Sequence, residues 1–247
     1  MNAQDYRQRD YRQRDYRQRD YRQRENPARA PRFLCIYLPM WSIEQCRKKL
    51  LKTRGSCDRL YKDTTLALAT TENGQRIIKR FGAHAARRGI REGTSVPLAR
   101  ALFRDLQIEE FDPADDCRAL FELAAWALKF SPRVALDPQL TTLLKQKKME
   151  KLSPLMNGIV LDLTGTERLH QSEEKLIQRI DSALRALGHR ARFGTARTLG
   201  AAWAVSRFSK SRISIISDES SIVDQTAELP LNSLRLEEPV LSSLKGL

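Results

Sequence analysis

The sequence predicts an α+β fold built around a mixed sheet. Residues 32–38 and 159–164 are short apolar runs rich in strand-forming residues, each bounded by turn residues or proline, so we expect two neighbouring buried strands. Residues 172–187 instead carry apolar side chains at helical spacing, which predicts an amphipathic helix. The 247 residues, with 41% apolar content, suffice for one large domain or two small ones.

The chain is strongly basic. Its formal net charge is +14 and its pI is near 10.0. Residues 5–24 are four copies of Asp-Tyr-Arg-Gln-Arg, and each copy adds one net positive charge, so ten of the fourteen lie elsewhere. This excess favours a polyanionic partner, because phosphates that bind basic surfaces release counterions. A generally basic soluble protein is the alternative.

The four repeats predict disorder. A period of five residues matches neither a helix nor a strand, and these side chains can bury little apolar surface. An Arg/Tyr arm that contacts phosphates and stacks on bases is the functional alternative. We expect a disordered tail over residues 1–31 and a folded part that begins near Arg32.

Cysteine and histidine patterns predict neither a disulfide framework nor a metal site. The cysteines are Cys35, Cys46, Cys57 and Cys117. They lack C-x-x-C spacing, so we expect reduced thiols, and the three histidines have no second ligand at metal-binding spacing. No apolar run of about 18 residues and no apolar signal core are present, which predicts a cytoplasmic protein with no membrane partner.

Turn residues and periodicity predict the elements that follow the first strand. A helix is expected over 41–50. Strands over 66–69 and 76–78 flank Asn73-Gly74, a dipeptide typical of tight hairpin turns. We therefore expect a helix followed by a β-hairpin.

The second half of the chain alternates helices and strands. Apolar residues at helical spacing predict a helix within 117–130 whose buried stripe is Leu120, Leu123, Ala124, Ala127 and Leu128. Residues 135–156 are expected to form a lysine-rich surface insertion. Ser172 and Gly188 are expected to begin and end the next helix, and 213–216 to form the last strand of the sheet.

The order of these elements resembles the palm and fingers of the Y-family DNA polymerases. The motifs that carry the likeness are 82–94, Ser131-Pro132-Arg133-Val134, Leu161-Asp162-Leu163-Thr164 and 194–204. The resemblance covers about Arg32 to Leu247. It implies a palm in which a mixed sheet has helices on one face, a small fingers module and an incomplete helical thumb.

The resemblance also implies domain boundaries. After the tail at 1–31 we expect the first part of the palm at 32–47, the fingers at 48–103, the second part of the palm at 104–216 and the start of the thumb at 217–247. We also expect the little-finger domain of the family to be absent.

Matched residue by residue, the sequence lacks the metal-binding carboxylates of the family. The first palm strand of active members ends in Asp, and an Asp-Glu pair precedes the second; here Tyr37, Asn157 and Gly158 stand at these positions. Two-metal phosphoryl transfer needs anionic oxygens to hold two divalent ions, and these residues supply none. We therefore expect no metal, no cofactor and no catalytic residue.

The groups that grip the incoming triphosphate are replaced as well. The Tyr and Arg of the fingers motif correspond to Ala83 and Ala86, and the Lys of the last motif corresponds to Trp203. The Gly-Ala-Ala-Trp-Ala sequence at 200–204 is typical of the ImuB branch, whose members keep the polymerase architecture without its catalytic groups. The resemblance is therefore to this branch, with no nucleotide-binding residues.

The resemblance implies an adaptor in DNA repair, translesion synthesis and damage-induced (SOS) mutagenesis. Its expected partners are DNA, the sliding clamp, an ImuA-like or RecA-like protein and an error-prone replicative-type polymerase. Residues 139–143 faintly resemble a clamp-docking peptide. The residues expected to contact DNA are Arg197, Arg207, Lys210 and Arg212.

Two alternatives stay open. An active error-prone translesion polymerase would need Mg²⁺, and its carboxylates would have to come from Asp63, Asp137 and Asp162. A basic DNA-binding module, or a gene fragment without independent function, is the other alternative, since basic charge alone supports binding to nucleic acid.

Overall fold

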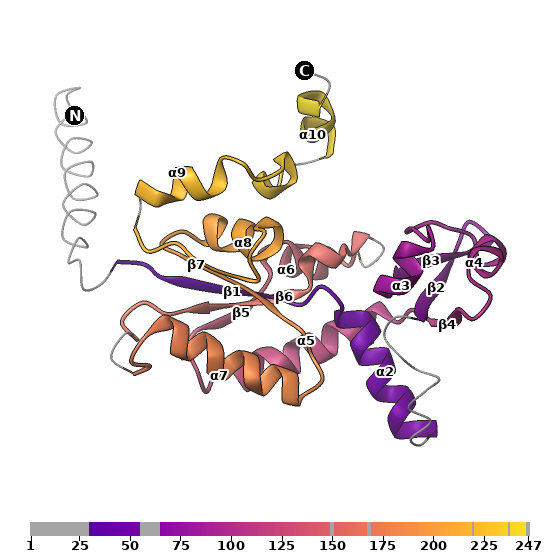
Figure 1. Cartoon of the computed structure of the whole chain (residues 1–247), viewed down its shortest axis with the longest axis horizontal. Helices are drawn as coiled ribbons and strands as arrows, with labels where there is room; N and C mark the ends of the chain where they lie inside the picture. The colour runs from indigo at the N-terminus through magenta and orange to yellow at the C-terminus, as the bar shows by residue number, and fades with distance from the viewer. Residues whose placement is uncertain are drawn as a thin grey trace, which may run out of the picture.

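The computed structural model describes residues 30–54, 65–148, 151–166, 169–218, 220–236 and 238–245 (Figure 1). The repeats at 5–24, Cys57 and Asp63 lie outside the described residues. The described part contains a five-stranded sheet and a separate three-stranded sheet.

The larger sheet is mixed, and its strand order is β5-β6-β1-β7-β8. These strands are β1 (Phe33–Tyr37), β5 (Val134–Leu136), β6 (Gly158–Asp162), β7 (Arg192–Ala196) and β8 (Ile213–Ile215). β1 runs antiparallel to both β6 and β7, whereas β7 and β8 are parallel. The prediction that residues 32–38 and 159–164 form neighbouring strands is confirmed.

Helices cover both faces of this sheet (Figure 1). α5 (Pro113–Ala127) and α7 (Glu173–Ala186) pack on the face that carries Leu34 and Ile36. α8 (Leu199–Phe208) packs on the other face, against Cys35. This arrangement corrects the expectation of helices on one face. It follows from the alternation of side chains along β1, whose two sides are both apolar.

Gly194 lets α8 approach β7 closely. A Cβ at this position would lie 2.3 Å from the carbonyl oxygen of Ala202 and 2.7 Å from the backbone nitrogen of Ser206. The small residues at 200–202 continue the close contact on the helix side. Residues of α8 are thereby held tightly against the sheet.

The fingers unit is built on the smaller sheet, with order β3-β2-β4. Its elements are β2 (Leu66–Glu72), β3 (Gln75–Phe81), α3 (Ala83–Arg87), α4 (Val96–Leu102) and β4 (Gln107–Glu110). The hairpin turn is confirmed, since Asn73 and Gly74 have φ of 49° and 76°. β4 was not predicted. It pairs in parallel with β2, so the fingers sheet extends past the predicted boundary at 103.

α2 (Trp41–Arg54) leads from the palm toward the fingers, and α5 leads back. Four residues of the predicted α5 stripe face the core, but Leu128 follows the last residue of the helix and is 53% exposed. α7 begins and ends as predicted: the Ser172 hydroxyl caps it, and Gly188 has φ of +83°.

Residues 135–156 are more than the expected surface insertion. They contain α6 (Pro138–Lys145) and a short 3₁₀ helix, η3 (Pro154–Met156). Asp137 caps α6 by accepting from the backbone nitrogen of Gln139 at 2.9 Å, and Leu140 is buried in the palm core. The first turn of α6 is therefore partly in the interior, and its lysine-rich end is exposed.

Three short elements follow the sheet, and the first two of them pack against α8 (Figure 1). They are α9 (Ser220–Thr226), the 3₁₀ helix η4 (Leu231–Leu234) and α10 (Glu238–Lys245). Short helices here agree with the expected start of a thumb. Among the described residues, no helix has both the length and the apolarity needed to cross a bilayer.

Candidate functional site

The three positions where the family carries its carboxylates meet at one end of the palm sheet. Tyr37 ends β1 and lies directly opposite Gly158, the first residue of β6. The backbone nitrogen of Leu38 donates to the carbonyl oxygen of Asn157 at 2.8 Å. Residues 37, 157 and 158 are therefore adjacent, although 120 residues separate the two strands in the sequence.

The guanidinium of Arg207 lies beside Tyr37 and Gly158. Its central carbon is 4.9 Å from the centre of the Tyr37 ring and 4.4 Å from that of Trp203. Its Nη2 is the nearest side-chain atom to the position that a Cβ on Gly158 would take, at 3.0 Å. Arg207 is only 8% exposed, so a permanent cation lies in the interior at the strand ends.

Asp137 neutralises this cation. Its Oδ2 accepts from Arg207 Nη2 at 2.8 Å and from the indole nitrogen of Trp203 at 2.6 Å, and the side chain is fully buried. The remaining guanidinium donors reach the Leu155 carbonyl and the Ser206 hydroxyl at 2.8 and 2.9 Å. Each guanidinium nitrogen thus has an acceptor, as a buried charge requires.

Burial sets the protonation of the groups around this ion pair. It raises the pKa of the Tyr37 phenol and, to about 12, that of the Cys35 thiol; in both cases the Arg207 charge opposes the shift. Burial lowers the pKa of Arg207, while the charge of Asp137 acts in the opposite direction. Tyr37 and Cys35 are therefore neutral at pH 7, and neither offers an anionic ligand.

These residues do not fit the divalent ions that polymerase chemistry uses. Neutral Tyr37 and Asn157 are weak ligands for Mg²⁺, and Gly158 has no side chain. A Cβ on Gly158 would also lie 2.6 Å from the carbonyl oxygen of Ile36. Among the described residues, Asp137 supplies the one carboxylate in hydrogen-bonding contact with Arg207, and this carboxylate is occupied by the guanidinium. Over the described ranges, no three His, Cys, Asp or Glu side chains form a group that could hold a metal ion.

Asp162, the other described carboxylate considered for catalysis, lies elsewhere. Asp162 ends β6 opposite Phe33, at the far end of β1 from Tyr37, and it pairs with Arg133 at 3.0 Å. Its Oδ1 accepts from the backbone nitrogen of Thr164. This carboxylate therefore shapes the turn after β6 and does not reach the strand ends at Tyr37.

The positions that would contact a triphosphate in active members of the family carry small or enclosed side chains here. Ala83 and Ala86 lie on α3 of the fingers, and neither can donate a side-chain hydrogen bond. Arg91 donates to the carbonyl oxygens of Ala86 and Ile90, so it closes the end of this short helix. Trp203 is 1% exposed and bonded to Asp137, so its indole fills the interior.

The four residues expected to contact DNA differ in their surroundings. Arg197 follows β7 and is exposed, and so is Lys210 after α8. Arg207 is buried in the ion pair with Asp137, so its placement does not fit the expected phosphate contact. Arg212 is bonded through both terminal nitrogens to Asp181, at 2.6 and 3.0 Å. Of these four residues, only Arg197 and Lys210 are exposed, as a contact with DNA requires.

Sequence reasoning missed the partnership of Asp137 and Arg207. An arginine near a helix end is usually exposed, so Arg207 was assigned to the surface. The Asp137-Pro138 dipeptide was a usable signal, since Asp before Pro is typical of a helix start. It could have identified α6 and placed Asp137 at its buried end.

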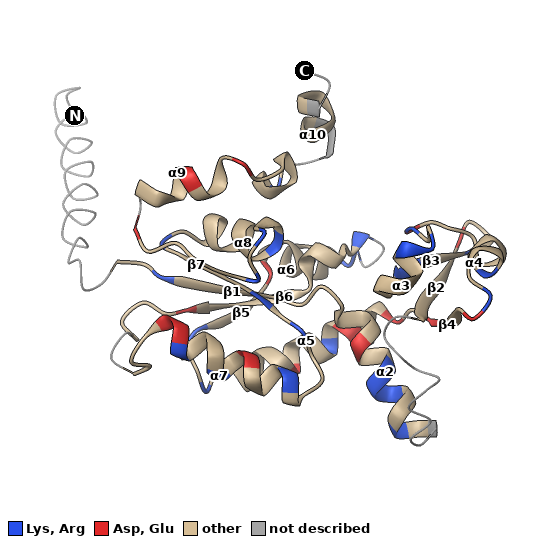
Figure 2. Ribbon diagram, viewed as in Figure 1, with Lys and Arg blue, Asp and Glu red and all other residues tan. Residues whose placement is uncertain are grey.

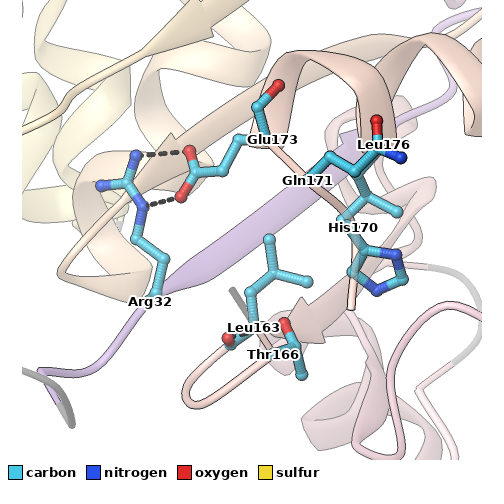
Figure 3. Close-up of a pocket in the computed structure, with 8 residues that line it drawn as sticks. Arg32, Leu163, Thr166, His170, Gln171, Glu173 and Leu176 are labelled. Carbon is cyan, nitrogen blue, oxygen red and sulfur yellow. Dashed lines mark hydrogen bonds and ion pairs between the residues drawn. The ribbon is translucent and has the colours of Figure 1, made fainter. Parts of the chain in front are cut away.

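A hollow of about 220 Å³ lies at the opposite end of β1 (Figure 3). Arg32 and Glu173 face each other at its edge as a double ion pair, with Nη2 and Oε2 2.6 Å apart. Arg32 also donates to the Thr195 hydroxyl at 3.1 Å. The two charges neutralise each other and tie the start of β1 to the start of α7, which is a structural role.

The fold and the strand-end site define the class of the protein. The fold is that of the palm and fingers of Y-family DNA polymerases. The crystal structure of DinB from Sulfolobus solfataricus is similar, with 13% identity, a TM-score of 0.61 and coverage of 87% of this chain and 57% of that chain. The post-insertion binary complex of Dbh DNA polymerase has 11% identity, a TM-score of 0.63 and the same coverage.

Sequence comparison gives the family. The impB/mucB/samB family matches residues 52–207, and the chain belongs to it. The chain is also similar to Protein ImuB from two strains of Caulobacter vibrioides, each 33% identical over 159 residues. These matches cover 64% of this chain and 31% of each relative, so the matched part is about a third of the relatives' length. The predicted resemblance to the ImuB branch is confirmed.

Proposed function

We propose that this chain is a non-catalytic, Y-family polymerase-like adaptor that acts on DNA during damage-induced mutagenesis and translesion synthesis. The observation that carries the proposal is the position of Arg207. Its guanidinium, stacked between the rings of Tyr37 and Trp203, lies at the strand ends where a polymerase needs anionic ligands.

The charges of this site do not suit phosphoryl transfer. A divalent ion would meet neutral ligands and an arginine, while the one carboxylate that contacts this arginine in the described part of the chain is already bound to it. An added carboxylate near Gly158 would form an ion pair with Arg207 before it could bind a metal. The proposed role therefore needs no metal cofactor.

The proposal assigns DNA contact to the exposed cations Arg197 and Lys210. Solved relatives of this fold include a binary complex of Dbh DNA polymerase, which supports nucleic acid as the partner. The net charge of +14 supports it as well. The proposal keeps the cytoplasmic location that the sequence predicts.

The proposed protein partners are a sliding clamp, an ImuA-like or RecA-like protein and an error-prone replicative-type polymerase. These come from the similarity to Protein ImuB and from the role that the resemblance implies. Residues 139–143 are poorly suited to dock on a clamp, because they lie in α6 and Leu140 is 1% exposed. A clamp contact would need another segment.

A primer-extension assay with Mg²⁺ or Mn²⁺ tests the proposal, when DNA binding is measured on the same primer–template by fluorescence anisotropy. We expect binding without extension, while an active Y-family polymerase extends the same substrate. Template-directed incorporation would establish the active-polymerase alternative. Binding should weaken in Arg197→Ala and Lys210→Ala and stay unchanged in Glu228→Ala, an exposed acidic control.

A further inference from the structure

A cavity of about 300 Å³ lies where α2, the end of α7 and the starts of β7 and β8 meet. Four arginines from four segments line it: Arg47 from α2, Arg185 from α7, Arg190 from the following loop and Arg212 before β8. Figure 2 shows that basic residues continue along the middle and the end of α2. A strongly basic hollow is therefore present outside the strand-end site.

Two carboxylates partly neutralise this cavity. Asp181 binds Arg185 at 3.0 Å and Arg212 at 2.6 Å. Glu44 is buried and accepts from His189 Nδ1 at 3.0 Å and from the backbone nitrogen of Arg190 at 3.2 Å. Four guanidinium groups thus line the cavity, and two of them share one carboxylate.

His189 makes the cavity rigid. Its side chain is 2% exposed and lies between Glu44 and Lys48, whose Nζ is 3.3 Å from Nε2. The ring also packs against Trp41, with centroids 4.8 Å apart. Gly188, at φ of +83°, turns the chain so that Arg190 follows this buried ring at the rim. The loop that carries Arg190 is therefore anchored to α2.

The end of α7 accounts for only part of this charge. Cations such as Arg185 and Arg190 are favoured near the exposed carbonyls of a helix C-terminus. Arg47 and Arg212 come from other elements, and their convergence on one hollow is a tertiary arrangement. Planar guanidinium groups are the side chains best suited to bind two phosphate oxygens at once.

We propose that this cavity binds a backbone phosphate of nucleic acid, as a second contact beyond Arg197 and Lys210. The inference rests on the proposed role on DNA. Arg190 precedes β7 and Arg197 follows it, so the two contacts lie at opposite ends of that strand. A nucleic-acid strand bound at both contacts would cross the edge of the palm. Its base sequence would not matter, because only phosphates are bound.

The test compares two double variants of equal charge. Arg185→Gln with Arg190→Gln removes two cavity cations that are largely exposed, and the Arg190 backbone bond to Glu44 is kept. Arg118→Gln with Arg133→Gln removes two other exposed arginines, each paired with an aspartate as Arg185 is. Affinity for a fluorescein-labelled primer–template is measured over a range of salt concentrations, with folding checked by circular dichroism.

We expect the cavity variant to lose affinity by about tenfold and the slope of log affinity against log salt to fall by about 1 for each lost phosphate contact. The control pair should change affinity by less than about twofold. Equal losses in both pairs would overturn the inference, because only total charge would matter.

Two further results separate this inference from the proposed function. Wild-type protein that binds no primer–template would overturn both. Wild-type protein that binds, with the cavity variant unchanged, would overturn the cavity alone. Pyrophosphate is titrated as well: tight binding that the cavity variant abolishes, without loss of primer–template affinity, would identify a site for a small free anion and overturn the assignment to a nucleic-acid backbone.

Discussion

The Asp137 carboxylate and the Arg207 guanidinium form an ion pair 2.8 Å long inside the palm, although they lie 70 residues apart. Asp137 also begins α6, and Arg207 lies near the end of α8, so the pair joins two elements across the strand ends. A buried pair of this kind contributes little net stability when intact, but removal of one partner leaves an uncompensated charge in the interior.

Asp137→Asn should destabilise the protein by about 3–5 kcal/mol, since Arg207 would stay charged without its partner. Asparagine keeps a side-chain oxygen that can cap α6, so the loss reports mainly on the ion pair. Urea unfolding measures the change. Asp181→Asn is the control: its partner Arg185 is exposed and Arg212 is partly exposed, and a loss of about 1 kcal/mol or less is expected there. Equal losses at the two sites would contradict a special role for the buried pair.

Trp203→Phe should destabilise by about 1–3 kcal/mol, because Asp137 loses the indole donor at 2.6 Å while a ring remains to stack on Arg207. The matched control is Trp126→Phe. The Trp126 ring packs against Phe130 and Lys129. Urea unfolding of both variants gives the comparison. A smaller loss at 203 than at 126 would mean that the indole hydrogen bond is unimportant.

Gly158→Ala should destabilise by about 1–3 kcal/mol, because the new Cβ would lie 2.6 Å from the Ile36 carbonyl oxygen and 3.0 Å from Arg207. Gly200→Ala is the control, since the nearest atom to its Cβ is 3.9 Å away, and alanine in α8 should be neutral or stabilising by up to about 1 kcal/mol. Thermal unfolding compares the two. A stable Gly158→Ala protein would show that the strand ends can accept the acidic residue of active relatives.

Local signals in the sequence predicted much of the framework. Asn73-Gly74 between two apolar runs predicts a hairpin turn, and the structure has this turn. Ser172 and Gly188 marked α7 because capping depends on neighbouring residues alone. Such features require no knowledge of distant contacts, so a single sequence is enough to find them.

Features that depend on tertiary contacts were missed. β4 has a weak pattern, Gln-Ile-Glu-Glu, and is a strand because β2 offers it a pairing edge. The second helical layer depends on Gly194, whose close approach to α8 is visible only in three dimensions. Arg207 has the composition of a surface residue and was placed there, whereas Asp137 and two aromatic rings hold it inside.

Asp116 gives the fold a pH dependence that can be isolated. Burial raises the pKa of this carboxyl from 3.8 to about 6, while a hydrogen bond from Ser42 and the charge of Arg80 oppose the shift. The folded protein therefore holds a proton between about pH 4 and pH 6 that the unfolded chain releases. The stabilisation from this proton is complete below about pH 4 and is lost as the pH rises through 6.

Asp116→Asn should remove this dependence, because asparagine stays neutral at every pH. We expect the variant to match wild type near about pH 4 and to be more stable by roughly 3 kcal/mol near about pH 7, where wild type must bury a charge. Urea unfolding at both pH values gives the difference, and subtraction of the variant cancels the other titrating groups. The Trp41 indole bond to the backbone oxygen of residue 116 is unaffected by the change. A difference that is the same at both pH values would mean that Asp116 is ionised throughout this range in the folded protein.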